Sequence, residues 1–189
     1  MTDARAFRLL LSAGLMVLVS PELHAAPAQP AAIDACALLT PGEVSSVVGK
    51  SVELTQPFDN GITPQGAHST TCIWASPLPA GVEPDPTKRL EGRGFVVISV
   101  MNWPGGPSDA RKFLDDFQRA FQEHGIESKP VAVNVGADDA LWWGDGVAAR
   151  KNGVSIGVSV AQFGDRAARQ PQAESLAKLI VKRLPARAP

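Results

Sequence analysis

The chain is poor in the residues on which catalysis and nucleic-acid binding most often depend. Its 189 residues include three histidines, and 18 Lys and Arg stand against 19 Asp and Glu, for a net charge of −1. Such a balance provides neither the basic footprint of a nucleic-acid-binding protein nor a polybasic membrane patch. The sequence has no P-loop, no His-Glu-x-x-His pair and no EF-hand loop. We therefore expect no nucleic-acid partner, no cofactor and no metal site.

Long apolar runs are also scarce, and the longest lies close to the N-terminus. Arg5 and Arg8 precede an apolar run over 9–19, and the small pair Ala25-Ala26 follows it. This order is typical of a secretory signal peptide, and the run is shorter than the roughly 20 residues of a membrane-spanning helix. We expect residues 1–25 to be removed, leaving no membrane span. The mature protein is then periplasmic or secreted.

Only two cysteines occur, Cys36 and Cys72. In an exported protein such a pair most often forms a disulfide, and two buried free thiols are the alternative. The disulfide would contribute about 3–4 kcal/mol in the chain-entropy model. A lipid-anchored Cys36 is a further alternative, but Asp34 places a charge where a lipoprotein cleavage box has a small or apolar residue.

The remaining chain has the length of one domain. Residues 26–33 are rich in Ala and Pro and are typical of a flexible linker, so we expect a single domain over 34–186. Thr40-Pro41-Gly42-Glu43 has the residues of a helix start with a capping box, and Gly49 can end that helix. Asn152-Gly153 is a strong hairpin signal.

Hydrophobic periodicity predicts the other elements. Strands are expected over 52–54, 70–75, 95–101, 131–135, 139–143, 147–151 and 154–160, and helices over 108–123 and 172–184. Hairpin connections and segregated helices indicate an α+β fold with two layers: a mostly antiparallel sheet with the helices packed on one face.

Tryptophan provides the main candidates for a binding surface, because the chain has four tryptophans and no tyrosine. Trp142 and Trp143 are neighbours on a predicted strand, so their rings point to opposite faces. One ring can join the core. The other lies over a face on which the next strand offers little bulk, with Ser155, Gly157 and Ser159. It either marks a binding surface or is covered by a loop over 55–69 or 76–93.

Two further residues are candidates for ligand or partner binding. Trp103 lies in a predicted loop, and His68 lies in a polar segment before a strand. Asp138, Asp139 and Asp145 gather near one sheet end and could hold Ca²⁺, but turn chemistry is the simpler explanation of these carboxylates. No catalytic residue is assigned.

Several short segments form one pattern along most of the mature chain: Asp34-Ala35-Cys36-Ala37-Leu38-Leu39-Thr40, Glu43-Val44, Gly49, Cys72-Ile73-Trp74 and Val135-Gly136-Ala137-Asp138-Asp139-Ala140. In this pattern the chain resembles a family of secreted bacterial proteins and lipoproteins of unknown function. The resemblance implies an extracytoplasmic α+β domain with a Cys36–Cys72 disulfide and no established chemistry. Unlike many members, this chain has no lipid-attachment cysteine directly after the leader.

These observations favour an exported, non-enzymatic binding or interaction domain whose ligand or envelope partner is unknown. A small envelope hydrolase that uses His68 with loop carboxylates is the first alternative. An inhibitor of a secreted enzyme is the second, and it rests on analogy between folds.

Overall fold

The structure, a computed structural model, describes residues 29–82, 90–123 and 130–185. The expected signal peptide over 1–25 lies outside the described residues. The elements are η1 (Ala35–Leu38), α1 (Pro41–Val48), β1 (Glu53–Ile62), β2 (His68–Ala75), β3 (Phe95–Asn102), α2 (Pro107–Glu123), β4 (Val131–Ala132), β5 (Asp139–Trp142), β6 (Gly146–Lys151), β7 (Val154–Ala161) and α3 (Arg166–Arg183).

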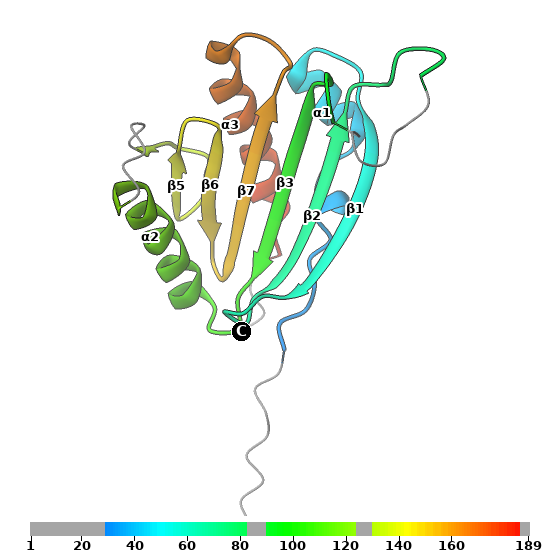
Figure 1. Cartoon of the computed structure of the whole chain (residues 1–189). Helices are drawn as coiled ribbons and strands as arrows, with labels where there is room; N and C mark the ends of the chain where they lie inside the picture. The colour runs from blue at the N-terminus through cyan, green and yellow to red at the C-terminus, as the bar shows by residue number, and fades with distance from the viewer. Residues whose placement is uncertain (1–28, 83–89, 124–129, 186–189) are drawn as a thin grey trace, which may run out of the picture.

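The strands form one seven-stranded sheet in the order β1-β2-β3-β7-β6-β5-β4 (Figure 1). Every neighbouring pair is antiparallel. The predicted α+β class and antiparallel sheet are therefore confirmed. The Asn152-Gly153 hairpin is confirmed as well, since Asn152 has φ 54° between β6 and β7.

The main core lies between one sheet face and the helices α1 and α3, together with η1. The sheet contributes Cys72 and Trp74 from β2, Val96, Ile98 and Val100 from β3, and Val154, Ile156, Val158 and Val160 from β7. The inner side of α3 contributes Ala173, Leu176, Ala177 and Ile180. Each fully buried Val, Leu or Ile side chain stabilises the fold by about 1.5–3 kcal/mol.

The Cys36–Cys72 disulfide is confirmed and joins η1 to β2. Nearby, the Thr70 hydroxyl donates to the Ile33 carbonyl at 2.6 Å and accepts from the Ala35 N–H at 3.2 Å. Ile33 itself packs against the core. The described part of the expected linker, residues 29–33, therefore includes a residue that is fixed to the domain.

The start of α1 is the one that the sequence predicts. Thr40 and Glu43 form the reciprocal capping box, Pro41 is in the first turn, and Gly49 closes the helix at φ 71°. Arg183, at the end of α3, pairs with the Glu43 carboxylate and donates to the Leu38 carbonyl at 2.6 Å. The same carboxylate thus caps α1 and links it to α3.

Replacing Glu43 by Gln is expected to remove part of the acid sensitivity of the domain. The hydrogen bond from Arg183, followed by the backbone hydrogen bond at Thr40, lowers the pKa of Glu43 from 4.5 to about 2. Because this pKa is lower in the folded chain, the carboxylate stabilises the fold above about pH 4.5, and this contribution is lost as the pH falls toward about 2. Urea midpoints of wild type and Glu43→Gln should differ at neutral pH and converge in acid; a constant difference would contradict this.

Three elements differ most from their predicted bounds. β1 covers ten residues instead of 52–54, with register shifts at two positions, and Asn60 donates to the hydroxyls of Ser69 and Thr71. α3 begins at Arg166 because Asp165 caps it, although Pro171 lies inside the helix. β4 is only two residues long.

The second helix differs from the expected arrangement, in which all helices share one face. α1 and α3 lie behind the sheet in Figure 1, whereas α2 lies on the other side, over β6 and β7. The physical reason is that the small residues of β7 leave this face open, and the apolar stripe of α2, which includes Phe113 and Phe117, packs there. No helix within the described ranges has the length and apolar character needed to cross a bilayer.

Candidate functional site

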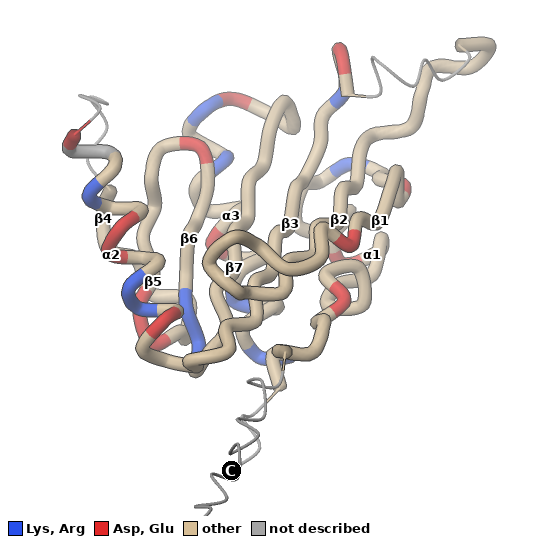
Figure 2. Tube along the Cα trace, turned by 60° about the horizontal axis from the view of Figure 1, so that its bottom comes forward, with Lys and Arg blue, Asp and Glu red and all other residues tan. Residues whose placement is uncertain are grey.

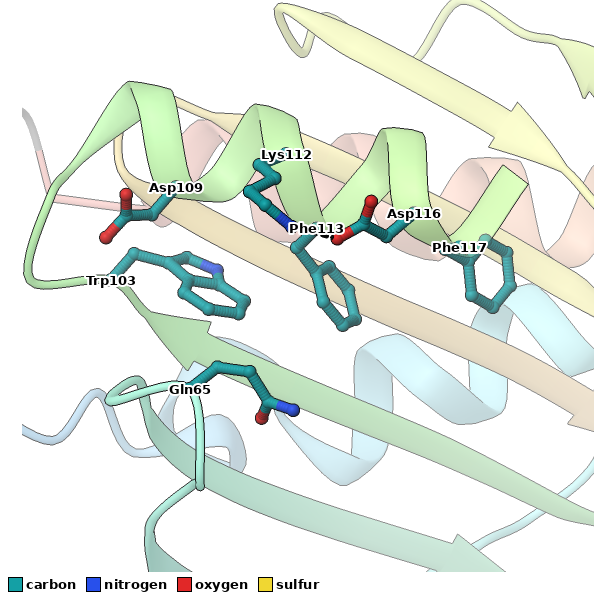
Figure 3. A pocket seen from close by; sticks show the side chains of 7 residues that line it. All are labelled: Gln65, Trp103, Asp109, Lys112, Phe113, Asp116 and Phe117. Atoms are coloured by element: carbon teal, nitrogen blue, oxygen red, sulfur yellow. Dashed lines mark hydrogen bonds and ion pairs between the residues drawn. The ribbon is translucent and has the colours of Figure 1, made fainter. Parts of the chain in front are cut away.

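A cleft lies between α2 and the sheet face opposite the main core. It comprises two adjoining cavities of about 470 and 210 Å³ that share Phe113 and Phe117. We call it the aromatic cleft. Its aromatic residues are Trp103, Phe113, Phe117 and Trp143. Figure 3 shows Trp103, Phe113 and Phe117 following one another beneath α2, with Gln65 on the far side of the gap.

The sheet beneath the aromatic cleft has three rows of residues that cross β3, β7 and β6. The rows are Met101, Ser155 and Arg150; then Ser99, Gly157 and Ala148; then Val97, Ser159 and Gly146. All of them except Arg150 and Gly146 line the cleft. The middle position of each row belongs to β7 and is Ser or Gly, so the floor is lowest along this strand.

Two aromatic contacts fix the side chains that form the two ends of the aromatic cleft. Trp103 is 6% exposed, its ring centroid lies 5.1 Å from that of Phe113, and its indole N–H donates to the Ser155 hydroxyl at 2.9 Å. At the other end, Phe117 meets Trp143 edge to face, with centroids 6.2 Å apart. Such aromatic pairs contribute about 0.5–1.5 kcal/mol beyond their buried area. The cleft is therefore largely preformed.

Glycine allows α2 to begin close to the sheet. A Cβ at Gly153 would lie 2.7 Å from the Gly106 Cα, and Gly106 itself has φ 65°. The Trp103 N–H also donates to the Gly153 carbonyl at 3.0 Å. Because the β6–β7 turn touches the residue before α2, the first turn of this helix is held against the hairpin.

Polar side chains on α2 form the rim of the aromatic cleft and bind one another. Lys112 pairs with Asp116, and Asp116 also lies 3.2 Å from Arg119. The hydrogen bond from Lys112 is the main cause that lowers the pKa of Asp116. Asp109 accepts from the Gly105 N–H at 2.8 Å. These charged groups thus have partners already. The rest of the cleft is mostly apolar, with serine hydroxyls on its floor.

The structure separates the four predicted binding candidates. Trp103 and Trp143 line the aromatic cleft. Trp142 packs against the main core, on the other face of the sheet. His68 lies at the start of β2 and contacts the Asp59 carboxylate at 2.7 Å. The ring that meets Trp143 comes from α2 and not from either loop that the sequence suggested. A binding role for any of the four stays a prediction.

Phe113, Phe117 and Gln65 line the cleft but were not among the sequence candidates. The two phenylalanines belong to the apolar stripe of α2, which periodicity alone assigns to the core. The sequence could have indicated them if the apolar stripe had been matched with the strand face of β7 that carries only Ser and Gly. Gln65 lies in the β1–β2 turn. Nothing in the sequence around this turn indicates that Gln65 lines a cleft.

Two groups that suggest chemistry have structural roles. Gly153-Val154-Ser155-Ile156-Gly157 has the spacing of a nucleophile elbow, but Ser155 lies inside β7, is buried and bonds Trp103, whereas an elbow needs a strand-to-helix turn. Asp138 and Asp139 pair with the buried Arg150. In the described parts of the chain, His, Cys, Asp and Glu form no group of three suited to a metal.

Comparison with known proteins adds a likeness of fold. No protein-family model matches the chain, and neither does any curated protein. Among solved structures, the extracellular domain of PknH from Mycobacterium tuberculosis is similar, with a TM-score of 0.53 and 17% sequence identity. The alignment covers 82% of this chain and 97% of that chain. At this identity the likeness concerns the fold alone.

Proposed function

We propose that this protein is an exported, non-enzymatic binding domain that takes a small, largely apolar or aromatic ligand into the aromatic cleft. The observation that carries the proposal is the combination of four aromatic side chains with a floor whose central strand, β7, presents only Ser and Gly. Ligand pockets are typically about 300–1,000 Å³ and mostly apolar, with a few polar groups that fix orientation. Gln65 and the polar side of α2 supply such groups at the rim.

The floor supports this proposal because the packing of the sheet leaves room for a larger residue there. Among the described residues, the nearest atom to a Cβ built at Gly157 is the Ser99 Cβ, at 3.9 Å. A well-packed protein would normally fill such space with larger side chains, since atoms that border a void have no neighbours to attract them on that side. A ligand that stacks on the rings of Phe113, Phe117 and Trp143 would fill this space.

Export is the second part of the proposal. The Cys36–Cys72 disulfide fits an oxidising compartment, and the N-terminal pattern is that of a signal peptide. The similar fold of PknH belongs to a domain described as extracellular. Membership of the secreted bacterial family that the sequence resembles stays a prediction, as do the hydrolase and inhibitor alternatives.

Filling the cleft from its floor is the sharpest test. Gly157→Leu should raise the Kd of a neutral aromatic probe, N-phenyl-1-naphthylamine, about tenfold or more, because its side chain occupies the space between β7 and Phe117. Probe fluorescence and tryptophan quenching both report the binding.

Gly42→Leu is the matched control, since Gly42 is exposed on α1 and a Cβ there meets nothing within 4 Å in the described part of the chain. This variant should bind the probe like wild type. Equal binding by Gly157→Leu and wild type, with both folded by circular dichroism, would refute the cleft as the ligand site.

A further inference from the structure

A second hollow lies on the helix side of the sheet, between α3 and the segment that leads into β5. It has a volume of about 660 Å³ and is lined by Asn134, Val135, Gly136, Lys151, Lys178, Val181 and Lys182. We call it the lysine pocket. Val135 and Val181 are buried members of the main core and form its base. It shares no residue with the aromatic cleft among the lining residues of the two.

Three lysines converge on this pocket from two elements. Lys178 and Lys182 are four residues apart on α3, so they lie on the same helix face. Lys151 ends β6 on the sheet face that carries Val147 and Ala149, and its ammonium donates to the Gly136 carbonyl at 3.2 Å. The lining thus combines the side chains of three lysines with that of Asn134.

In the described part of the chain, no acidic residue lines the lysine pocket. Carboxylates near it are Glu174, 4.0 Å from the Lys178 ammonium, and Asp138, 4.0 Å from the Lys151 ammonium. Asp138 is also shared with the Arg150 guanidinium at 3.5 Å and the Asn152 N–H at 2.7 Å. Lys178 and Lys151 thus each have one carboxylate at the outer limit of an ion pair. Figure 2 shows acidic and basic segments side by side around β5 and β6.

Favourable interaction with the helix dipole explains only one of the three lysines in the lysine pocket. A cation in the last turn of a helix is favoured by the helix dipole, which accounts for Lys182. Lys178 lies further back in α3, and Lys151 belongs to a strand. Like charges that share a hollow repel one another, and a bound anion removes this cost.

We propose that the lysine pocket binds a multivalent anion of the phosphate class, such as a phosphate monoester or diphosphate group. Ammonium groups bind phosphate oxygens as strong charge-assisted donors. The pocket is larger than a single phosphate, so it has room for an anion that is part of a larger molecule. That molecule is either a soluble phosphorylated compound or the headgroup of an anionic lipid, and these share the same recognising chemistry.

The test titrates the mature protein with inorganic pyrophosphate by calorimetry at low salt. The double variant Lys178→Gln/Lys182→Gln should raise the Kd roughly tenfold or more, because two of the three cations are lost. Lys50→Gln makes a matched charge change at an exposed site after α1 and should leave the Kd unchanged. Both positions in the double variant are exposed, so equal urea midpoints can verify folding.

Sedimentation with vesicles distinguishes the two sources of the anion. Phosphatidylcholine vesicles, which carry no net charge, should sediment neither protein. If phosphatidylglycerol vesicles then sediment wild type but not Lys178→Gln/Lys182→Gln, the anion is a lipid headgroup. Pyrophosphate binding without vesicle binding indicates a soluble compound. The proposal is overturned if wild type binds neither probe, or if the double variant binds both as wild type does.

Discussion

Reduction of the Cys36–Cys72 disulfide is expected to lower the free energy of unfolding by about 4 kcal/mol, because the chain-entropy model assigns this value to a loop of this length. The two cysteines are 36 residues apart and join η1 to β2. Domains of this size have about 5–15 kcal/mol of stability, so the loss is a large part of the total. Urea unfolding with and without dithiothreitol measures it, provided that both transitions are reversible.

A double Cys36→Ser/Cys72→Ser variant serves as the control for reductant effects. It should unfold at the same urea concentration as the reduced protein. Because Thr70 also bonds Ile33 and Ala35, the reduced protein should keep a folded sheet at neutral pH. Oxidised and reduced proteins that unfold together would show that the disulfide does not stabilise the domain.

Trp74→Ala is expected to cost about 3–5 kcal/mol, the range for truncating a large buried aromatic side chain. Trp74 is 1% exposed and lies on β2, opposite Val96 of β3 and close to Cys72 in the main core. Its removal leaves a cavity that α1 and α3 cannot close without moving. Thermal and urea unfolding of the purified variant measure the loss.

Trp143→Ala is the matched control, because the same truncation is made on the cleft side of the sheet. Trp143 is half-buried, and its ring meets that of Phe117. We expect a loss of about 1–2 kcal/mol, which loosens α2 but leaves the main core intact. Equal losses in the two variants would contradict the assignment of Trp143 to a cleft and not to the core.

Local signals in the sequence were enough for much of the fold. The capping box of Thr40 and Glu43 and the Asn152-Gly153 turn act through neighbours in the chain, so their geometry follows from the residues themselves. The strict alternation of β7 likewise predicts a strand with two unlike faces. The cysteine pair was correct because only one intramolecular pairing exists.

Elements that depend on distant partners could not be predicted in the same way. β1 contains Pro57, Asp59 and Asn60, which are unusual in strands, yet it forms because β2 offers a complete hydrogen-bonding edge. Such residues are tolerated at a sheet edge, where only one side must pair. α3 starts at Arg166, where Asp165 caps it, and continues through Pro171 although a proline inside a helix removes one backbone hydrogen bond.

The position of the aromatic cleft also could not be predicted from the sequence. Amphipathicity marks the face of α2 that must be covered, but it does not say which side of the sheet covers it. That choice depends on Gly106 and Gly153, which bring the helix start against the β6–β7 turn. Trp103 and Trp143 stand out in the sequence as rare aromatic residues, but their place in the cleft, like that of Phe113 and Phe117, follows only once the helix is placed.

The two faces of β7 make folding and the shape of the aromatic cleft separable by mutation. One face carries Val154, Ile156, Val158 and Val160, which pack under the helices, whereas Gly157 and Ser159 face the cleft. A library randomised at Gly157, Ser159 and Ser99 would therefore alter the shape of the cavity while leaving the layer that drives folding untouched. Directed evolution could in this way fit the cavity to chosen ligands by changing every second residue of two adjacent strands.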